Sequence, residues 1–123
     1  MASLVATRDA LAAAVNAVDA SLRVKTRPVK TARADDGWVI VGKVTPSTYA
    51  ACDATFVVLV LLGADEARAE DRFGALVVPL VDALTKGALH PQDVTAEPVT
   101  VLVGEPAVPM YALTLTLTLE VDS

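Results

Sequence analysis

The feature that most constrains the fold is a strict alternation near the end of the sequence. From Tyr111 to Val121, every odd position is apolar, and the even positions hold mainly threonine. A period of two is that of a β-strand, whose successive side chains point to opposite faces. A shorter alternation runs from Val99 to Val103, and turn residues at positions 104–106 separate the two segments. The pair predicts a long antiparallel hairpin with one apolar face and one threonine face.

Two further strands are predicted in the middle of the chain. Thr55 to Leu62 is a continuous apolar run, which predicts a strand covered on both faces by helices, by a second sheet or by another subunit. Trp38 to Val44 is rich in β-forming residues, with Gly42 as a bulge. We expect a turn at Asp35-Asp36-Gly37, where glycine allows a positive φ, and a loop at Thr45-Pro46-Ser47.

Two segments carry the 3.6-residue period of a helix. The first begins after the N-cap residue Ser3 and places its larger apolar side chains on one stripe, formed by Leu4, Leu11, Val15, Val18 and Leu22. The second begins at the N-cap Asp65 and ends at Gly87, with Pro79 on its outer side as a predicted kink. Its apolar face consists of Phe73, Leu76, Val77, Leu80, Val81 and Leu84.

The order of these elements favours an α+β fold. A helix, two or three strands, a second helix and two final strands contain no recurring βαβ unit. We therefore expect a mainly antiparallel sheet of four to five strands with two helices packed on one face. The chain has 123 residues, of which 54% are hydrophobic and 20% are charged. These values are typical of one soluble globular domain, and we assign residues 1–123 to it.

The charge distribution is uneven. The net charge is −5, which argues against a protein that grips nucleic acid through a basic surplus. Half of the ten basic residues nevertheless fall within an acid-free segment, and these five are the candidate subunit-interface residues: Arg23, Lys25, Arg27, Lys30 and Arg33. Their alternation and the following Pro28 indicate an edge strand or an extended arm. Such a segment is either simply solvated or contacts the acidic surface of a neighbouring subunit.

No constellation of catalytic, metal-binding or cofactor-binding residues is apparent in the sequence. His90 is the only histidine and Cys52 the only cysteine, and neither has partners at metal-ligand spacing. No glycine-rich phosphate loop follows a predicted strand. The longest apolar run, Ala54 to Ala64, is about half of the roughly 20 residues that a membrane helix needs. We therefore expect a non-enzymatic protein without a membrane segment or signal peptide, made in a cytoplasm.

The order of features resembles the tail terminator proteins of long-tailed bacteriophages, which are also called minor tail proteins. The resemblance is one of pattern and length over nearly the whole chain. Its matching parts are the opening helix (Leu4 to Leu22), the basic segment (Arg23 to Arg33), two strands (Gly37 to Val41 and Phe56 to Leu62), the acidic start of the second helix (Ala64 to Asp71) and the terminal strand (Tyr111 to Leu117).

The resemblance implies a structural virion protein at the head-proximal end of the tail. Family members form a six-fold ring that caps the finished tail tube and faces the head-side connector. The implied partners are other copies of the chain, the tail-tube protein and the connector protein. DNA passes through the ring without specific binding, which suits the acidic balance. Two alternatives remain: another head–tail joining role (a neck or tail-completion protein) and a small ferredoxin-like ligand-binding or regulatory domain.

Overall fold

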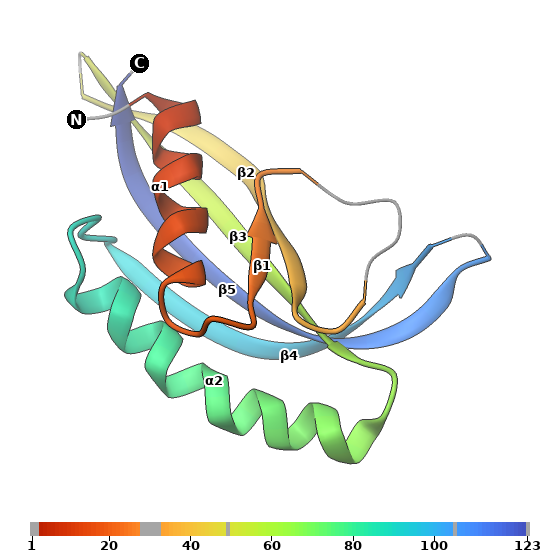
Figure 1. Ribbon diagram of the computed structural model, residues 1–123. Helices are drawn as coiled ribbons and strands as arrows, with labels where there is room; N and C mark the ends of the chain where they lie inside the picture. Colours follow the sequence, from red (N-terminus) through yellow and green to blue (C-terminus); the bar gives the residue numbers. More distant parts are fainter. Residues whose placement is uncertain (1–2, 28–32, 49, 105, 123) are drawn as a thin grey trace.

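The structure is a computed structural model that describes residues 3–27, 33–48, 50–104 and 106–122. Two helices pack on one face of a five-stranded, mostly antiparallel sheet (Figure 1), which confirms the predicted α+β fold. In chain order the elements are α1 (Leu4–Asn16), β1 (Arg23–Lys25), β2 (Asp36–Thr48), β3 (Ala51–Gly63), α2 (Glu66–Lys86), β4 (Asp93–Val103) and β5 (Val108–Asp122).

The strand order across the sheet is β1-β2-β3-β5-β4. The final strand β5 therefore lies between β3 and β4, and it pairs antiparallel with both. The predicted hairpin of the last two strands is confirmed, with Val103 opposite Val108 at its end. The short strand β1 pairs with β2 in parallel, over the three positions Arg23–Lys25.

The core lies between the helices and the face of the sheet predicted to be apolar. On β5 the side chains of Leu113, Leu115, Leu117, Leu119 and Val121 are all buried there. They meet the inward face of β3 and the buried stripe of each helix, which consists of Leu11 and Val15 on α1 and Leu76, Leu80 and Leu84 on α2. The alternation of the terminal strand is thus confirmed.

The first helix is shorter than its apolar stripe suggests. Ser3 caps it as predicted, accepting a hydrogen bond from the Ala6 N–H at 3.2 Å, but the helix ends at Asn16 rather than near Leu22. The side-chain amide of Asn16 donates to the carbonyl of Val24 at 2.8 Å and accepts from its N–H at 2.7 Å. This pairing holds the end of α1 beside β1, and Leu22 reaches the core from the connecting turn.

The second helix agrees closely with its prediction. Asp65 is the N-cap and accepts a hydrogen bond from the Arg68 N–H at 3.2 Å, and Gly87 follows the last helical residue. The helix is continuous through the exposed residue Pro79. Lys86 and Asp82 form the exposed i,i+4 ion pair expected on the outer face, at 3.7 Å.

Two local predictions were wrong. Thr45–Ser47 is not a loop, because β2 continues to Thr48 after a bulge between Val41 and Val44, at the predicted position of Gly42. Among the described residues, the strand beyond Trp38 has only β3 as a neighbour, and an edge position tolerates Pro46, which has no N–H to donate. The turn before β2 places its positive φ (70°) at Asp35, while Gly37 already lies in the strand.

Candidate assembly surfaces

The basic segment begins as the edge strand that its alternation predicts. On β1 the side chains of Arg23 and Lys25 are exposed, whereas Val24 points into the core. Arg27 and Arg33 are also exposed. Lys30 and Pro28 lie outside the described residues. The interface role of the five basic residues stays a prediction, but four of them now have a place in the fold.

Arg23 is bound within its own chain. Its Nε donates to Asp36 Oδ1 at 2.6 Å, and one terminal nitrogen donates to the Ala34 carbonyl at 2.9 Å. Burial would raise the pKa of the Asp36 carboxyl, but hydrogen bonds from Arg23 and from the Arg33 N–H, together with these positive charges, hold this pKa below its usual value. Arg23 therefore fastens β1 to the start of β2, in the parallel register that puts the two residues opposite each other.

Lys25 and Arg27 differ from Arg23 in this respect. Neither makes a salt bridge within the part of the chain that the structure describes. We call these two exposed residues the basic edge. The backbone of the same strand is partly occupied, because Asn16 satisfies both polar groups of Val24. The basic edge therefore offers charged side chains to a partner.

A second polar cluster, which the sequence did not reveal, is centred on Arg72 of α2. Its guanidinium lies 3.2 Å from Asp19 Oδ2 and 3.1 Å from Asp35 Oδ1, and it donates to the Ser21 hydroxyl at 2.6 Å. Hydrogen bonds from the side chain and backbone of Ser21, with a further contribution from Arg72, lower the pKa of Asp19. The cluster connects α2 to the two turns that flank β1, so it orients the basic edge relative to the helices.

The face of the sheet opposite the helices is only partly covered by the residues that the structure describes. A small cluster there buries Leu59, Leu61 and Ala112 against neighbours that include Trp38 and the valines at 99, 101 and 103. Farther along the same face, Ile40 of β2 is 43% exposed. Cover was expected on both faces of Thr55–Leu62, and the helices supply it on one of them. We call the other face of the sheet the open face.

The end of the β4–β5 hairpin is apolar on both of its faces. It projects beyond the helices (Figure 1). Leu102 is 72% exposed and lies opposite Pro109, while Val108 is 47% exposed and lies opposite Val103. Opposed residues share a face and successive residues alternate, so these two pairs lie on opposite sides of the ribbon. We call residues 101–103 and 108–110 the hairpin tip.

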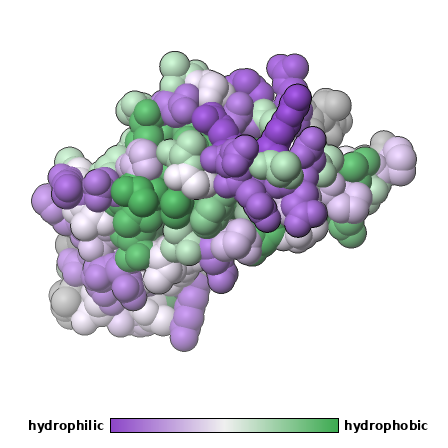
Figure 2. Space-filling view, turned by 90° about the horizontal axis from the view of Figure 1, so that it is seen from below, coloured by the Kyte–Doolittle hydropathy of each residue, from purple (hydrophilic) through white to green (hydrophobic). Residues whose placement is uncertain are grey.

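The outer surface of α2 is divided in two. Figure 2, which views the molecule from the side of α2, shows a hydrophobic area next to a strongly hydrophilic one. The apolar residue Val78, in the second half of the helix, is 63% exposed. The first half carries exposed charged residues, among them Glu66, Arg68 and Glu70. The acidic start of this helix is therefore available to a partner.

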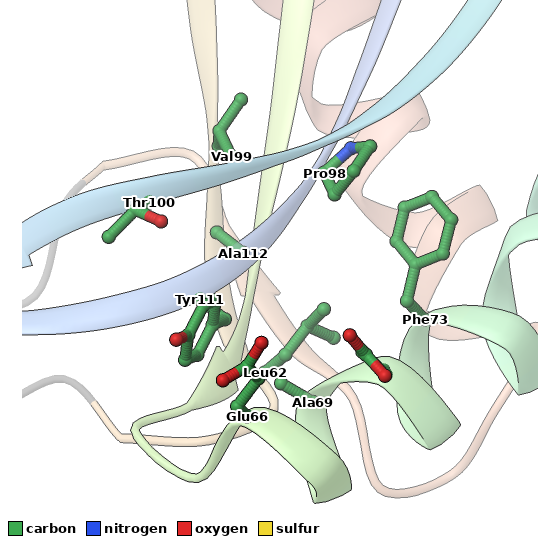
Figure 3. Close-up of a pocket in the computed structure, with 10 residues that line it drawn as sticks. Leu62, Glu66, Ala69, Phe73, Pro98, Val99, Thr100, Tyr111 and Ala112 are labelled. Carbon is green, nitrogen blue, oxygen red and sulfur yellow. The ribbon is translucent and has the colours of Figure 1, made fainter.

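A groove of about 450 Å³ separates the first half of α2 from β4 and β5 (Figure 3). Its walls are mostly apolar, and they include Leu62, Phe73 and Ala112. The polar lining residues are Glu66 and Glu70 from α2, Thr100 from β4 and Tyr111 from β5. Figure 3 shows the Glu66 carboxylate beside Tyr111, at the side of α2 that faces the strands. We call this feature the acidic groove.

The two residues considered for chemistry lie apart from these surfaces. His90 is exposed, in the connection after α2, with a positive φ of 52°. Cys52 is half-buried on β3 and is unpaired. Among the residues that the structure describes, no three His, Cys, Asp or Glu side chains are grouped as a metal site would require. None of the described helices has both the length and the apolar character needed to cross a bilayer.

A comparison of the sequence with models of known protein families and with curated proteins finds no match.

Proposed function

We propose that this chain is a structural protein of a phage tail, whose subunits form a ring that caps the tail tube and joins it to the head-side connector. The proposal combines the resemblance in the sequence with the surfaces that the fold leaves uncovered. Such a subunit acts by contact alone. It must touch two neighbours in its ring, the tube on one side and the connector on the other.

The observation that carries the proposal is the hairpin tip. Exposure of apolar side chains to water is unfavourable. Their burial in a contact stabilises the complex by about 25 cal/mol per Å² of apolar surface. Leu102 and Val108 are exposed on opposite sides of this ribbon. A contact with other subunits would cover both sides at once, which a flat contact could not do. We therefore take the apolar residues gathered at this tip as a candidate protein–protein contact.

The remaining surfaces differ from one another in character. The basic edge is cationic, the acidic groove carries two carboxylates, and the open face is partly apolar. A terminator needs unlike surfaces, because it must bind the end of a tube without offering the next ring an equivalent end. The net charge of −5 also suits a channel through which DNA slides without sticking.

The proposal is tested by adding the purified protein to polymerising tail-tube protein. The expected result is shorter tubes, with the protein found at one end only by electron microscopy of labelled samples. Protein along the whole tube, or tubes of unchanged length at every ratio, would contradict a terminator. Binding to the head-side connector without any effect on tubes would instead identify a neck or tail-completion protein.

The most useful variant for this assay is Lys25→Glu with Arg27→Glu. Both side chains are exposed and lack a salt bridge among the described residues, so their reversal should leave the fold intact. Arg23 is left unchanged, because a glutamate there would face the Asp36 carboxylate at the position of the present ion pair. The variant should lose its effect on tube length while retaining its melting temperature.

The acidic groove favours one alternative, a small ligand-binding or regulatory domain. Its volume of about 450 Å³ falls in the range of small-molecule pockets. Two carboxylates beside apolar walls would select a ligand that is cationic and partly apolar. Thermal denaturation with a panel of amines would detect it as a rise in melting temperature. Such a rise in the wild type, absent in Glu66→Gln with Glu70→Gln, together with no effect on tubes, would favour this alternative.

A further inference from the structure

We infer that two copies of this chain meet head to tail, with the basic edge of one copy in the acidic groove of the next. The contact rests on the proposed ring and specifies which surfaces join its neighbouring subunits. Its occupant is a second copy, because the chain itself carries a matching pair of surfaces.

The two surfaces are built on different strands of the sheet. The basic edge begins on β1, which is the first strand in the spatial order, and the groove is bounded by β4, which is the last. The groove also takes Leu62 from β3 and its two carboxylates, Glu66 and Glu70, from α2. Within the described residues, neither Lys25 nor Arg27 forms a salt bridge with these carboxylates. The basic edge of one copy is therefore free to meet the groove of another copy.

The strands that bear the basic edge and the acidic groove carry opposite charges. Strand β1 carries Arg23 and Lys25 and no acidic residue, whereas β4 carries Asp93 and Glu97 and no basic one. Asp93 and Glu97 point to the open face, like their partners Thr118 and Thr114, and the carboxylates in the groove itself are those of Glu66 and Glu70. All four of these acidic residues are exposed. Within the described part of the chain, none of them takes part in a salt bridge.

The lining of the groove also fits the chemistry of the basic edge. Lysine and arginine have apolar stems that pack on hydrophobic surface while their charged ends seek polar partners. The walls around Leu62, Phe73 and Ala112 can accept such stems. Glu66 and Glu70 then receive the charged ends, and the aromatic rings of Phe73 and Tyr111 are suitable neighbours for a cation.

This arrangement makes the contact heterologous, since each subunit uses a different surface toward each neighbour. Repetition of a heterologous contact gives a closed ring when the rotation closes. The Arg72 cluster holds α2 to the turns beside β1 through Asp19 and Asp35. It therefore fixes the angle between the two surfaces within one subunit, on which closure depends.

The test is a charge exchange, measured by sedimentation velocity at about 0.1 M and 1 M salt. One variant carries Lys25→Glu and Arg27→Glu, a second carries Glu66→Lys and Glu70→Lys, and a third carries all four changes. Each of the first two places like charges in contact and should weaken self-association at least about tenfold. The third restores opposite charges and should recover the oligomer. Wild-type association should be weaker at the higher salt, because salt screens the contact.

The matched control reverses the exposed pair at the end of α2, as Asp82→Lys with Lys86→Glu, and should associate like the wild type. If the third variant, with all four changes, stays monomeric while the wild type forms oligomers, the proposed contact is overturned. The ring would then have to form through other surfaces. Unchanged association of the groove variant would overturn the contact as well. A wild type that remains monomeric, with or without tube protein, and leaves tubes unchanged would overturn both. Melting curves of all variants verify that they are folded.

Discussion

Gly37 lies against Leu59 so closely that a β-carbon on residue 37 would overlap the Leu59 carbonyl oxygen. The contact joins β2 to β3 at the point where β1 also attaches, since Val24 is the parallel partner of Gly37. The missing side chain thus allows three strands to meet.

We expect Gly37→Ala to lower the free energy of unfolding by about 1 to 3 kcal/mol, because backbone atoms must move to relieve the overlap. Urea unfolding provides the measurement. The matched control is Gly74→Ala on α2, where an added β-carbon has no atom of the rest of the described chain, outside its own helical turn, within 4 Å. That control should gain about 0.5 to 1 kcal/mol, since alanine favours a helix over glycine. Equal effects of both changes would contradict the close approach.

The Arg23–Asp36 ion pair gives a pH-dependent contribution to stability. The pKa of Asp36 is lowered in the fold, so the folded chain binds a proton there more weakly than the unfolded chain does. The contribution is complete above the unfolded-state value of about 3.9 and is lost as the pH falls through the lower folded-state value. Asp36→Asn should cost about 1 to 2 kcal/mol at pH 7, a value reduced by the 42% exposure of the Arg23 side chain.

Urea unfolding at pH 7, 4 and 2 checks this expectation. The difference between wild type and Asp36→Asn should be largest at pH 7 and should shrink toward pH 2. Asp82→Asn, at the exposed pair on α2, serves as the control with little effect. A difference that is constant over this pH range would show that the carboxylate charge is not responsible.

The terminal strand should respond to alanine substitutions in alternation. Leu115→Ala removes a fully buried side chain and should cost about 2 to 5 kcal/mol. Thr116→Ala, on the open face, should cost far less. Thr114 is intermediate, because its hydroxyl donates to the Glu97 carbonyl at 3.1 Å, and Thr114→Val should cost about 1 kcal/mol. A uniform set of melting temperatures would contradict this placement of the strand.

Leu102→Asp with Val108→Asp should abolish assembly while leaving the isolated fold unchanged. Both side chains are exposed, so a charge there costs little until a partner covers it. Co-sedimentation with tail-tube protein and sedimentation velocity provide the measurements. Val78→Asp on α2, which is exposed at 63%, is the comparison for an apolar site outside the hairpin. Undiminished assembly of the hairpin variant would remove the hairpin tip from the proposed contacts.

The elements with strong periodicity could be predicted from the sequence, and those set by tertiary contacts could not. The alternation of β5 and the stripe and caps of α2 identified their elements and buried faces, because burial imposes these periods directly. The end of α1 depends on Asn16 reaching Val24, eight residues away. The strand position of Pro46 depends on the edge of β2 there, which no described strand covers. Neither relationship has a local sequence signal.

The same distinction applies to the candidate surfaces. The exposure of Arg23 and Lys25 followed from their alternation with Val24. The pairing of Arg23 with Asp36 did not, because it depends on a parallel register, and alternation alone does not specify strand direction. The acidic groove joins α2 to residues near positions 100 and 111, so it exists only once the sheet has formed.

The position of β5 between β3 and β4 has a consequence for how the protein is made. A ribosome completes β3, α2 and β4 before it synthesises the strand that separates β3 from β4. Until then one edge of β3 lacks the strand that later pairs with it, and β4 has no strand to pair with. The hairpin tip and the acidic groove both include residues near the start of β5, so neither surface is complete on the nascent chain before that point. Synthesis thus sets the earliest moment at which a subunit can join its neighbours.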